Sequence, residues 1–492
     1  MKKYIVIVLL VIAIIGVVYY INKTKTKTED NSAGMLIIKA EEYIDDKQYS
    51  KALEQYKLAI NADPSITQSY IEAANIYLLK SKKDEALSIL KSGENNTTNP
   101  DQTHYLIGKI YYENYDMQNA LEYFEKANNE NPNNFENAIY LIKTFSYYPD
   151  KKEQMKKVIE NIKSDDQEVK NWINYYLALL SYEDINKSIS YLEESSNIED
   201  SEIKNKINDF LKSAKKIQTD PEDIVQNNTL LVYELIRGEL YPLAIPLLEK
   251  VISENDEYYA AFMYLGICYI NMNNLDKAKE NLQSSVTVDP NQIQPKIFLA
   301  QVYTKQNNQK DAIDIYEEIL NTDKTNETAR YDYAKTLVKF NLLSQAKQQY
   351  LELINLVTDK KIEYEIELVE IYLDNSNESV EGLNLSKSII DDWNASEHNT
   401  ELKAKALDLL GWSYQKNSQK DEALNYISQS QELYSYLPAS YYHLGVIYRE
   451  IGNQIEATVN LERAIDLDLE GSISSKAIAE LEKLQNESKS TN

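Results

Sequence analysis

A recurrence of about 34 residues is the feature that most limits how this chain can fold. Windows of this length open in one phase at residues 33, 67, 101, 135 and 169, and in a second phase at 225, 259, 293, 327 and 361. A third phase opens at 404 and 438. Such a period is typical of helical hairpins that bury their apolar faces only by stacking on their neighbours. The recurrence therefore predicts a solenoid.

Three places in the window carry the pattern: a small residue at the eighth, Tyr at the eleventh and Ala at the twentieth. Small residues let the two helix axes approach closely, whereas larger side chains would hold them apart and leave voids. The tyrosine is expected to fill the gap above them and to keep its hydroxyl near solvent. The seven windows that share the pattern contain Ala40, Tyr43 and Ala52; Ala74, Tyr77 and Ala86; Gly108, Tyr111 and Ala120; Gly266, Tyr269 and Ala278; Ala300, Tyr303 and Ala312; Gly411, Tyr414 and Ala423; and Gly445, Tyr448 and Ala457.

The composition agrees with long helices and short connections. The 492 residues include only 11 Gly and 10 Pro but 40 Tyr, which argues against a β-rich chain with many tight turns. Pro64, Pro132 and Pro290 each follow Asp or Asn at the end of a second helical stretch. Because Pro denies the preceding residue its helical conformation, these pairs predict where the second helices end.

A helix-turn-helix unit with Leu-Gly, Tyr, Ala, Phe and Pro at these places resembles the tetratricopeptide repeat. The resemblance is closest in YLIGKIYYENYDMQNALEYFEKANNENP and in YLGICYINMNNLDKAKENLQSSVTVDP, and it covers about residues 33–471. It implies an all-α, right-handed superhelical solenoid of about twelve hairpins. The phase breaks predict blocks at 33–202, 225–393 and 404–471, separated by an interrupting helix and linker at 203–224 and a linker at 394–403. An amphipathic helix at 472–487 is expected to cap the array.

The first residues form a candidate membrane anchor. Residues 4–21 are an uncharged run of 18 residues, which is long enough to cross a bilayer as a helix. Lysines flank both ends, and Tyr19 and Tyr20 lie where an interfacial aromatic belt is expected. A cleaved signal peptide has a shorter apolar region and a small-x-small site, which this run lacks. We therefore predict an uncleaved, single-pass transmembrane helix.

A polar spacer at residues 22–32 follows the anchor. About ten residues span at most roughly 35 Å, so the repeats are expected to lie close to the membrane. The flanking lysines are nearly balanced and do not decide the orientation. Because a short flank ahead of a first apolar helix usually stays in the cytoplasm, we expect the repeats on the outer side.

Charge and motifs exclude several kinds of site. The net charge of −26 opposes binding to phosphate backbones, so nucleic-acid binding is disfavoured. No GxGxxG, P-loop or GxSxG motif is present. The single Cys268 excludes an intramolecular disulfide, and His104, His398 and His443 lack a second His at ligand spacing. We therefore predict no enzymatic activity, no cofactor and no metal.

In the resembled family, the first helices line a concave face that binds protein or peptide segments. Carrying the family's inward-pointing places over to this chain implies a partner-binding surface, although each residue could instead pack between neighbouring hairpins. The Lys and Asn clamp of chaperone-binding members is absent, so docking to a chaperone is not implied. The residues selected are Tyr105, Lys109 and Tyr112; Met263, Ile267 and Ile270; and Tyr442, Val446 and Arg449.

We interpret the chain as a membrane-anchored scaffold for protein or peptide partners. A bacterial envelope or secretion complex is the expected setting, by analogy at the level of the fold. One alternative is a chaperone-like or regulatory adaptor on the cytoplasmic side, acting on translocon or envelope-biogenesis components. Another is an enzyme that carries a repeat module, but the repeats leave no uninterrupted stretch of about 100 residues for a catalytic domain.

Overall fold

The computed structural model describes residues 32–195, 202–357, 359–374, 376–393 and 399–490. In these ranges the regular structure is entirely helical, with 26 α-helices and two short 3-10 helices. The predicted anchor at 4–21 lies outside the described residues, as does the spacer up to residue 31. Among the helices that are described, none is both long and apolar enough to cross a bilayer.

The helices pair into hairpins in chain order, and the described ranges hold twelve pairs, as the periodicity predicts. The first five are α2 (Ala33–Asp45) with α3 (Tyr49–Ala62), α4 (Thr67–Leu79) with α5 (Lys83–Gly93), α6 (Pro100–Glu113) with α7 (Met117–Glu130), α8 (Phe135–Phe145) with α9 (Lys152–Glu160), and α10 (Gln167–Leu180) with α11 (Ile185–Glu194). A single helix, α12 (Glu202–Thr219), follows them.

Seven further hairpins and a last helix complete the array. They are α13 (Ile224–Arg237) with α14 (Tyr241–Glu254), α15 (Tyr259–Asn271) with α16 (Leu275–Val288), α17 (Ile293–Lys305) with α18 (Gln309–Thr322), α19 (Glu327–Lys339) with α20 (Leu343–Leu356), α21 (Lys361–Asp374) with α22 (Ser379–Asp391), α23 (Thr400–Lys416) with α24 (Lys420–Leu433), α25 (Pro438–Glu450) with α26 (Gln454–Leu467), and finally α27 (Ser472–Ser490). The 3-10 helices η1 (Pro149–Lys151) and η2 (Ser376–Glu378) precede α9 and α22.

Close contact within the hairpins explains the small residues of the repeat. The alanines at the twentieth place, from Ala52 to Ala457, are all fully buried. At Gly411 on α23, an added Cβ would lie 2.5 Å from Ile427 Cγ1 and 2.9 Å from the Ala423 carbonyl oxygen on α24. Both distances are well below ordinary van der Waals contact. The eighth and twentieth places are therefore small because the paired helices touch there.

The tyrosine at the eleventh place reaches the preceding hairpin as well as its own. The Tyr111 hydroxyl accepts a hydrogen bond from Lys91 Nζ at 2.7 Å, and the Tyr303 hydroxyl accepts one from Gln283 at 2.8 Å. Both partners lie on the second helix of the hairpin before. The ring is thus at least half-buried while its hydroxyl stays within reach of polar groups at the surface.

The turn inside a hairpin imposes a left-handed backbone conformation at the fifteenth place of the window. The φ angle there is 51° at Lys47, 60° at Tyr115 and 59° at Glu239, and only the last hairpin has a glycine, Gly452, at this place. Residues with a Cβ are strained in this conformation, and Asn tolerates it best. The turn geometry is therefore common to these hairpins even though the residue type varies.

The sequence phase breaks at residues 203–224, but the apolar core does not. Ile203, Ile207 and Phe210 of α12 are buried in the same cluster that extends from Ala120 on α7 to Cys268 on α15. The helix α12 thus continues the apolar core from the fifth hairpin to α13. The predicted block boundaries concern the phase of the sequence repeat. The apolar core continues across the boundary at residues 203–224, so the boundaries stay a prediction.

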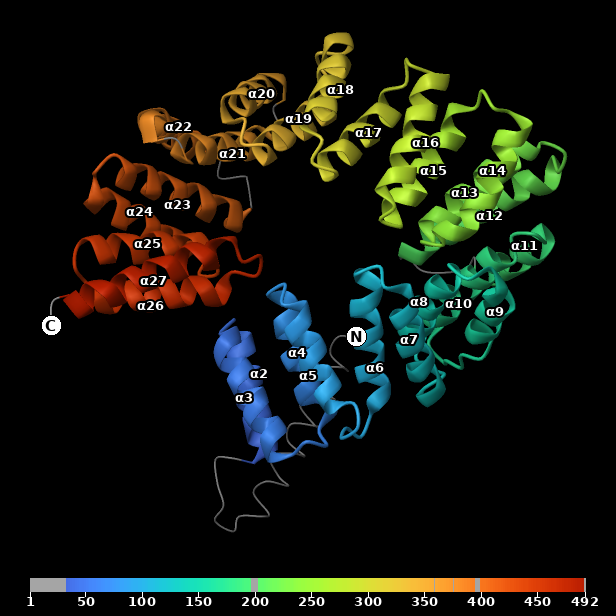
Figure 1. Ribbon diagram of the computed structural model, residues 1–492, viewed down its shortest axis with the longest axis horizontal. Coiled ribbons are helices and arrows are strands. Elements are labelled where there is room, and N and C mark those ends of the chain that lie inside the picture. Colours follow the sequence, from blue (N-terminus) through green and yellow to red (C-terminus); the bar gives the residue numbers. More distant parts are fainter. Residues whose placement is uncertain (1–31, 196–201, 358, 375, 394–398, 491–492) are drawn as a thin grey trace.

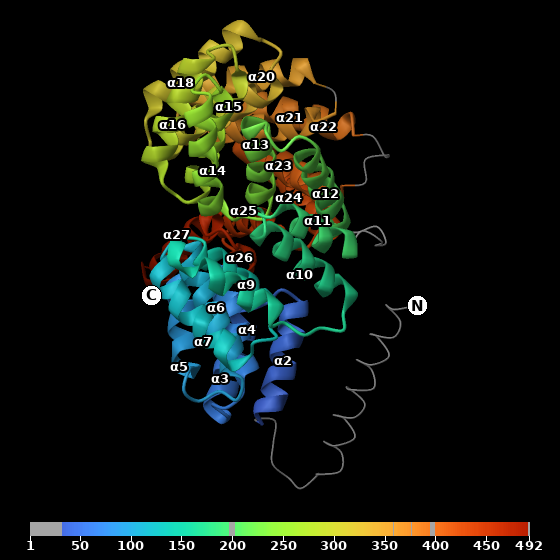
Figure 2. The ribbon, with the colours of Figure 1, turned by 90° about the vertical axis from the view of Figure 1, so that its right-hand side faces the viewer.

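The hairpins follow a ring (Figure 1). Along α15 to α22, the first helix of each hairpin lies nearer the middle and the second lies farther out. Figure 2 shows α2–α7 below and α13–α22 above, with α25–α27 between them. The array returns on itself, so that α26 lies against α3. The first helices make the inner surface, which is the surface that the family resemblance implies for partner binding.

Candidate functional site

An aromatic cavity lies between three successive first helices, α6, α8 and α10. Its volume is about 350 Å³. Consecutive helices supply its walls because the same face of each first helix turns inward in a regular stack. Its lining consists of Tyr105 and Lys109 from α6, Phe135, Glu136, Ile139 and Tyr140 from α8, and Trp172 and Tyr176 from α10. We call this cavity the inner pocket.

The aromatic rings of the inner pocket support one another. Tyr140 makes an edge-on contact with Tyr105, with the ring centroids 5.8 Å apart, and another with Tyr112 at 5.4 Å. Trp172 stacks on Tyr176 with the centroids 6.3 Å apart. Such pairs add to the free energy of area burial and hold the rings in place. The pocket is therefore a preformed wall of rings.

Charged groups lie at the edge of this wall. Lys109 Nζ is 5.7 Å from the centroid of Tyr140, and Lys143 Nζ is 5.3 Å from it. Lys143 is held by an ion pair of 2.8 Å with Glu239. Burial, followed by the negative charge of Glu136, raises the pKa of Tyr105, so its hydroxyl stays protonated and can donate a hydrogen bond. The pocket thus combines apolar surface with both signs of charge.

Of the nine residues selected from the sequence, two line the inner pocket. Tyr105 and Lys109 contribute directly to it. Tyr112 lies beside it, in contact with Tyr140 and with Phe124 of α7. Desolvation raises the pKa of Tyr112 as well. All three residues of the first predicted group therefore lie in or beside the inner pocket.

The second group lies on α15, away from the inner pocket. Met263 and Ile270 are half-buried and pack against the apolar cluster that joins α16 to α17 and α18. Ile267 is also half-buried. This arrangement agrees with the alternative that residues at these places pack between neighbouring hairpins.

The third group, on α25, lies against the last helix of the chain. Arg449 forms ion pairs with Glu480 at 2.8 Å and with Glu487 at 3.1 Å, both on α27. Tyr442 packs on the apolar cluster that includes residues of α27, and Val446 is buried. The last helix, α27, thus covers the side of α25 on which Tyr442 and Arg449 lie.

Two more residues of the inner pocket could have been found from the inward-pointing places of the next window. Ile139 occupies the fifth place of the window at 135, as Tyr105 does in its own window, and Glu136 occupies the second place, which also points inward in the resembled family. Tyr176 was hidden because it stands at the eighth place, where a small residue is expected. Trp172, at the fourth place, has no equivalent in the pattern.

The two described histidines are buried among polar partners. His104 lies between Glu94 and Glu130, at 3.3 and 2.9 Å. His443 Nδ1 lies 3.0 Å from the Asp408 carboxylate and stacks on Trp412 with the ring centroids 4.2 Å apart. In the described ranges, no three His, Cys, Asp or Glu side chains are grouped so that they could hold a metal ion. His398 lies outside the described residues.

Comparison with protein families bears directly on the repeat. A family model described as tetratricopeptide repeat matches residues 101–134 and 438–470, which coincide with α6–α7 and α25–α26. These windows have the same phase as the other hairpins of their runs. The chain is a tetratricopeptide repeat protein. A second family model, described as anaphase-promoting complex, cyclosome, subunit 3, matches residues 238–319 of this tetratricopeptide repeat protein.

A curated relative and several solved structures resemble the tetratricopeptide repeat protein over different lengths. Anaphase-promoting complex subunit 3 of Schizosaccharomyces pombe is 27% identical over 124 residues, which is 25% of this chain and 18% of that protein. The Cut9–Hcn1 hetero-tetramer of the same type of complex is 14% identical, covers 91% of this chain and 96% of its own, and has a TM-score of 0.35. A tetratricopeptide repeat protein of Parabacteroides merdae is 14% identical, covers 53% and 99%, and has a TM-score of 0.39.

Proposed function

We propose that this tetratricopeptide repeat protein is a membrane-anchored scaffold that binds a segment of a partner protein in the inner pocket. The observation that supports the proposal is the convergence of Tyr105, Tyr140, Trp172 and Tyr176 from three successive first helices on one cavity of about 350 Å³. Apolar cavities with a few polar groups are the usual form of recognition sites. Aromatic side chains of this kind dominate binding free energies at protein interfaces.

The chemistry of the pocket indicates the kind of segment that it takes. Its rings suit an apolar or aromatic side chain, while Lys109 and Glu136 at its edge can pair with polar groups on either side of that side chain. An extended or helical segment lying along the first helices would present its residues in this way. The overall charge of −26 favours a partner whose surface is neutral or basic.

Site-specific photo-crosslinking in intact cells tests the proposal. A photo-reactive phenylalanine analogue replaces Tyr105 in the full chain, and the covalent adducts are separated by mass. We expect a discrete adduct that is lost when Trp172→Ala is added, because removal of one central aromatic residue costs about 2 kcal/mol of binding free energy. That cost corresponds to about 30-fold weaker binding.

Leu58 provides the matched control position. It lies on α3, the second helix of its hairpin, and its side chain is 44% exposed. A crosslinker there should not form the Tyr105 adduct. The proposal fails if both positions give the same adducts, or if the Tyr105 adduct survives Trp172→Ala.

Membrane attachment is a separate part of the proposal and is supported by the uncharged run at residues 4–21. The full chain should stay in the membrane fraction after an alkaline wash, and a chain lacking residues 4–21 should be released. Added protease distinguishes the two orientations, because it digests the repeats of intact cells only if they lie outside. Protection of the repeats would instead favour the cytoplasmic adaptor.

A further inference from the structure

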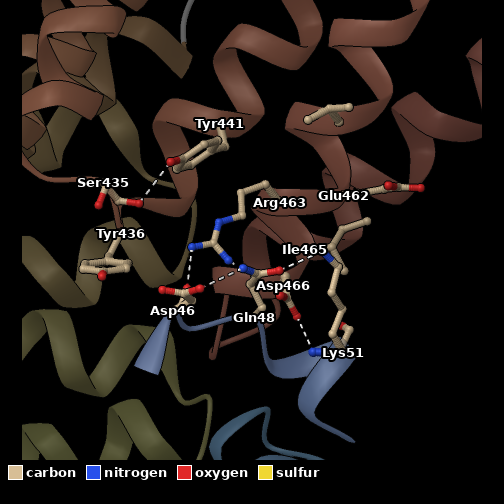
Figure 3. A pocket seen from close by; sticks show the side chains of 12 residues that line it. Asp46, Gln48, Lys51, Ser435, Tyr436, Tyr441, Glu462, Arg463, Ile465 and Asp466 are labelled. Atoms are coloured by element: carbon tan, nitrogen blue, oxygen red, sulfur yellow. Dashed lines mark hydrogen bonds and ion pairs between the residues drawn. The ribbon is translucent and has the colours of Figure 1, made fainter. Parts of the chain in front are cut away.

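The first and last hairpins of the array meet along a polar seam. The Asp466 carboxylate of α26 accepts a hydrogen bond of 2.6 Å from the backbone N–H of Ser50 on α3. The Arg463 guanidinium donates to the carbonyl oxygens of Asp46, at 2.9 Å, and of Lys47, at 3.0 Å. Figure 3 shows Arg463 and Asp466 directed at the turn between α2 and α3. These contacts join residues more than 400 positions apart in the chain.

The second hairpin adds to the same seam. Lys80, at the end of α4, donates to the Ile465 carbonyl oxygen at 3.1 Å and lies 3.5 Å from the Asp466 carboxylate. Lys47 Nζ lies over the ring of Tyr436, 3.9 Å from its centroid. The first two hairpins of the array therefore both form hydrogen bonds with the last hairpin.

The seam differs from the contacts between neighbouring hairpins because no apolar cluster of the described residues crosses it. The cluster of the first hairpins includes Leu36, Tyr56 and Ile76, and the cluster of the last hairpin includes Ala457 and Leu461, with no residue in common. Neighbouring hairpins elsewhere share such clusters, as α7 to α15 do. The seam therefore lacks the apolar burial that stabilises the rest of the array.

An open cleft runs along the seam. Its volume is about 830 Å³, and its walls come from both ends of the chain, with Gln48 and Lys51 on one side and Tyr441 and Glu462 on the other (Figure 3). A well-packed interface leaves no cavity of this size. Water can therefore reach the polar contacts from the cleft and replace them one by one.

Burial of Lys80 at the seam also opposes closure. Its side chain is 13% exposed, and that of Asp466 is 12% exposed. Burial lowers the pKa of Lys80, and the Asp466 carboxylate offsets only part of that effect. A partly buried ion pair of this kind contributes little net stability, but removing one partner leaves an uncompensated charge.

We propose that the seam is a reversible latch between the two ends of the solenoid. When the latch is closed, the inner surface lies inside a ring. When it opens, the ends of the array separate. A segment in the middle of a partner chain, which cannot be threaded through a closed ring, can then reach the inner pocket. The effect on partner entry rests on the proposed function, whereas the opening itself does not.

Distances between spin labels in the full chain test the latch. Labels replace Glu54 on α3 and Glu462 on α26 in a Cys268→Ala background, since both side chains are exposed and their helices meet at the seam. A control pair at Glu54 and Glu85 stays within the first two hairpins. We expect one short distance across the seam in the parent chain and an added long distance in Asp466→Ala.

Further variants separate opening from unfolding. Arg463→Lys keeps the charge but cannot donate to two carbonyls as the guanidinium does, so it should also populate the long distance. Lys420→Ala removes an ion pair of 3.3 Å with Glu450 away from the seam and should leave the short distance unchanged. The latch is wrong if both seam variants show only the short distance between Glu54 and Glu462. It is also wrong if the long distance appears together with a changed distance in the control pair and a loss of helical circular dichroism, because the hairpins would then be unfolding.

The Tyr105 crosslink then measures partner entry. Opening the latch with Arg463→Lys should raise the yield of the adduct at least twofold if the closed ring restricts entry. An unchanged yield in a chain whose spin labels have separated would overturn the restriction while leaving the latch intact. Absence of any adduct in the parent chain would refute the proposed function and, with it, the restriction on entry, but not the measured opening.

Discussion

Replacing Gly411 with alanine should destabilise the hairpin of α23 and α24, although alanine is the better helix former. The added Cβ would lie 2.5 Å from Ile427 Cγ1, 2.9 Å from the Ala423 carbonyl oxygen and 3.0 Å from the Ile427 nitrogen. Two of these three atoms belong to the backbone of α24. Rotation of a side chain cannot relieve such contacts, so the two helices must move apart.

The magnitude follows from two opposing effects. Overpacking a close helix contact costs about 1–3 kcal/mol, and the upper part of that range applies where backbone atoms are involved. Replacing a helical Gly by Ala returns about 1 kcal/mol. We therefore expect Gly411→Ala to lower the free energy of unfolding of this hairpin by about 2 kcal/mol, or about 30-fold in its opening equilibrium.

Hydrogen exchange is the suitable assay because long repeat arrays do not unfold in a single transition. The amides of α23 and α24 should exchange about 30-fold faster, while those of α15 and α16 should not change. Gly34→Ala is the matched control, since an added Cβ there meets no atom within 4 Å. It should be neutral or stabilising by about 0.5 kcal/mol. If Gly411→Ala behaves in the same way, close helix approach is not the reason for the small residues of the repeat.

Three further predictions concern strain, pH and the thiol. Tyr115→Gly should raise the free energy of unfolding by about 0.5–1 kcal/mol in urea titrations, because Tyr115 is held at φ 60°, and Asn273→Gly at the equivalent place should raise it less. Burial raises the pKa of Glu234 from 4.5 to about 7, so the folded chain binds the proton more tightly than the unfolded chain. Stability should therefore fall by up to about 3 kcal/mol as the pH rises from 4.5 to 7, and Glu234→Gln should remove most of that slope between pH 4.5 and 8; an equal slope in the variant would contradict the assignment. Burial raises the pKa of the Cys268 thiol to about 12, so a thiol reagent should label it only after the α15 hairpin opens, and rapid labelling of the native chain would refute this.

The local structure of the hairpins could be predicted because it depends on residues that are close in sequence. Helices begin at or within four residues of the first position of each predicted window, as α2 does at Ala33 and α15 at Tyr259. The Asp-Pro and Asn-Pro pairs end the second helices as expected, since α3 stops at Ala62, just before Asp63-Pro64. The helix-ending residues and the small side chains affect structure only within their own window. The hairpin can therefore be predicted without knowledge of distant contacts.

The inner pocket could be predicted only in part. Tyr105 and Lys109 followed from their places in the repeat, and Glu136 would have followed from the same places in the next window. Trp172 and Tyr176 could not, because Trp172 stands at the fourth place, which the pattern does not include, and Tyr176 stands at the eighth place, where a small residue is expected. The position of the pocket therefore depends on how irregular hairpins stack.

The sequence by itself determined the repeating hairpin, since a small residue, a tyrosine and an alanine at constant spacing specify how two adjacent helices pack. Only the tertiary structure decided that the array turns far enough to bring Asp466 against Ser50. That meeting is the sum of small rotations between successive hairpins, each set by side-chain volumes at its own contact. No single window encodes the sum, so closure of the ring has no signature in the sequence.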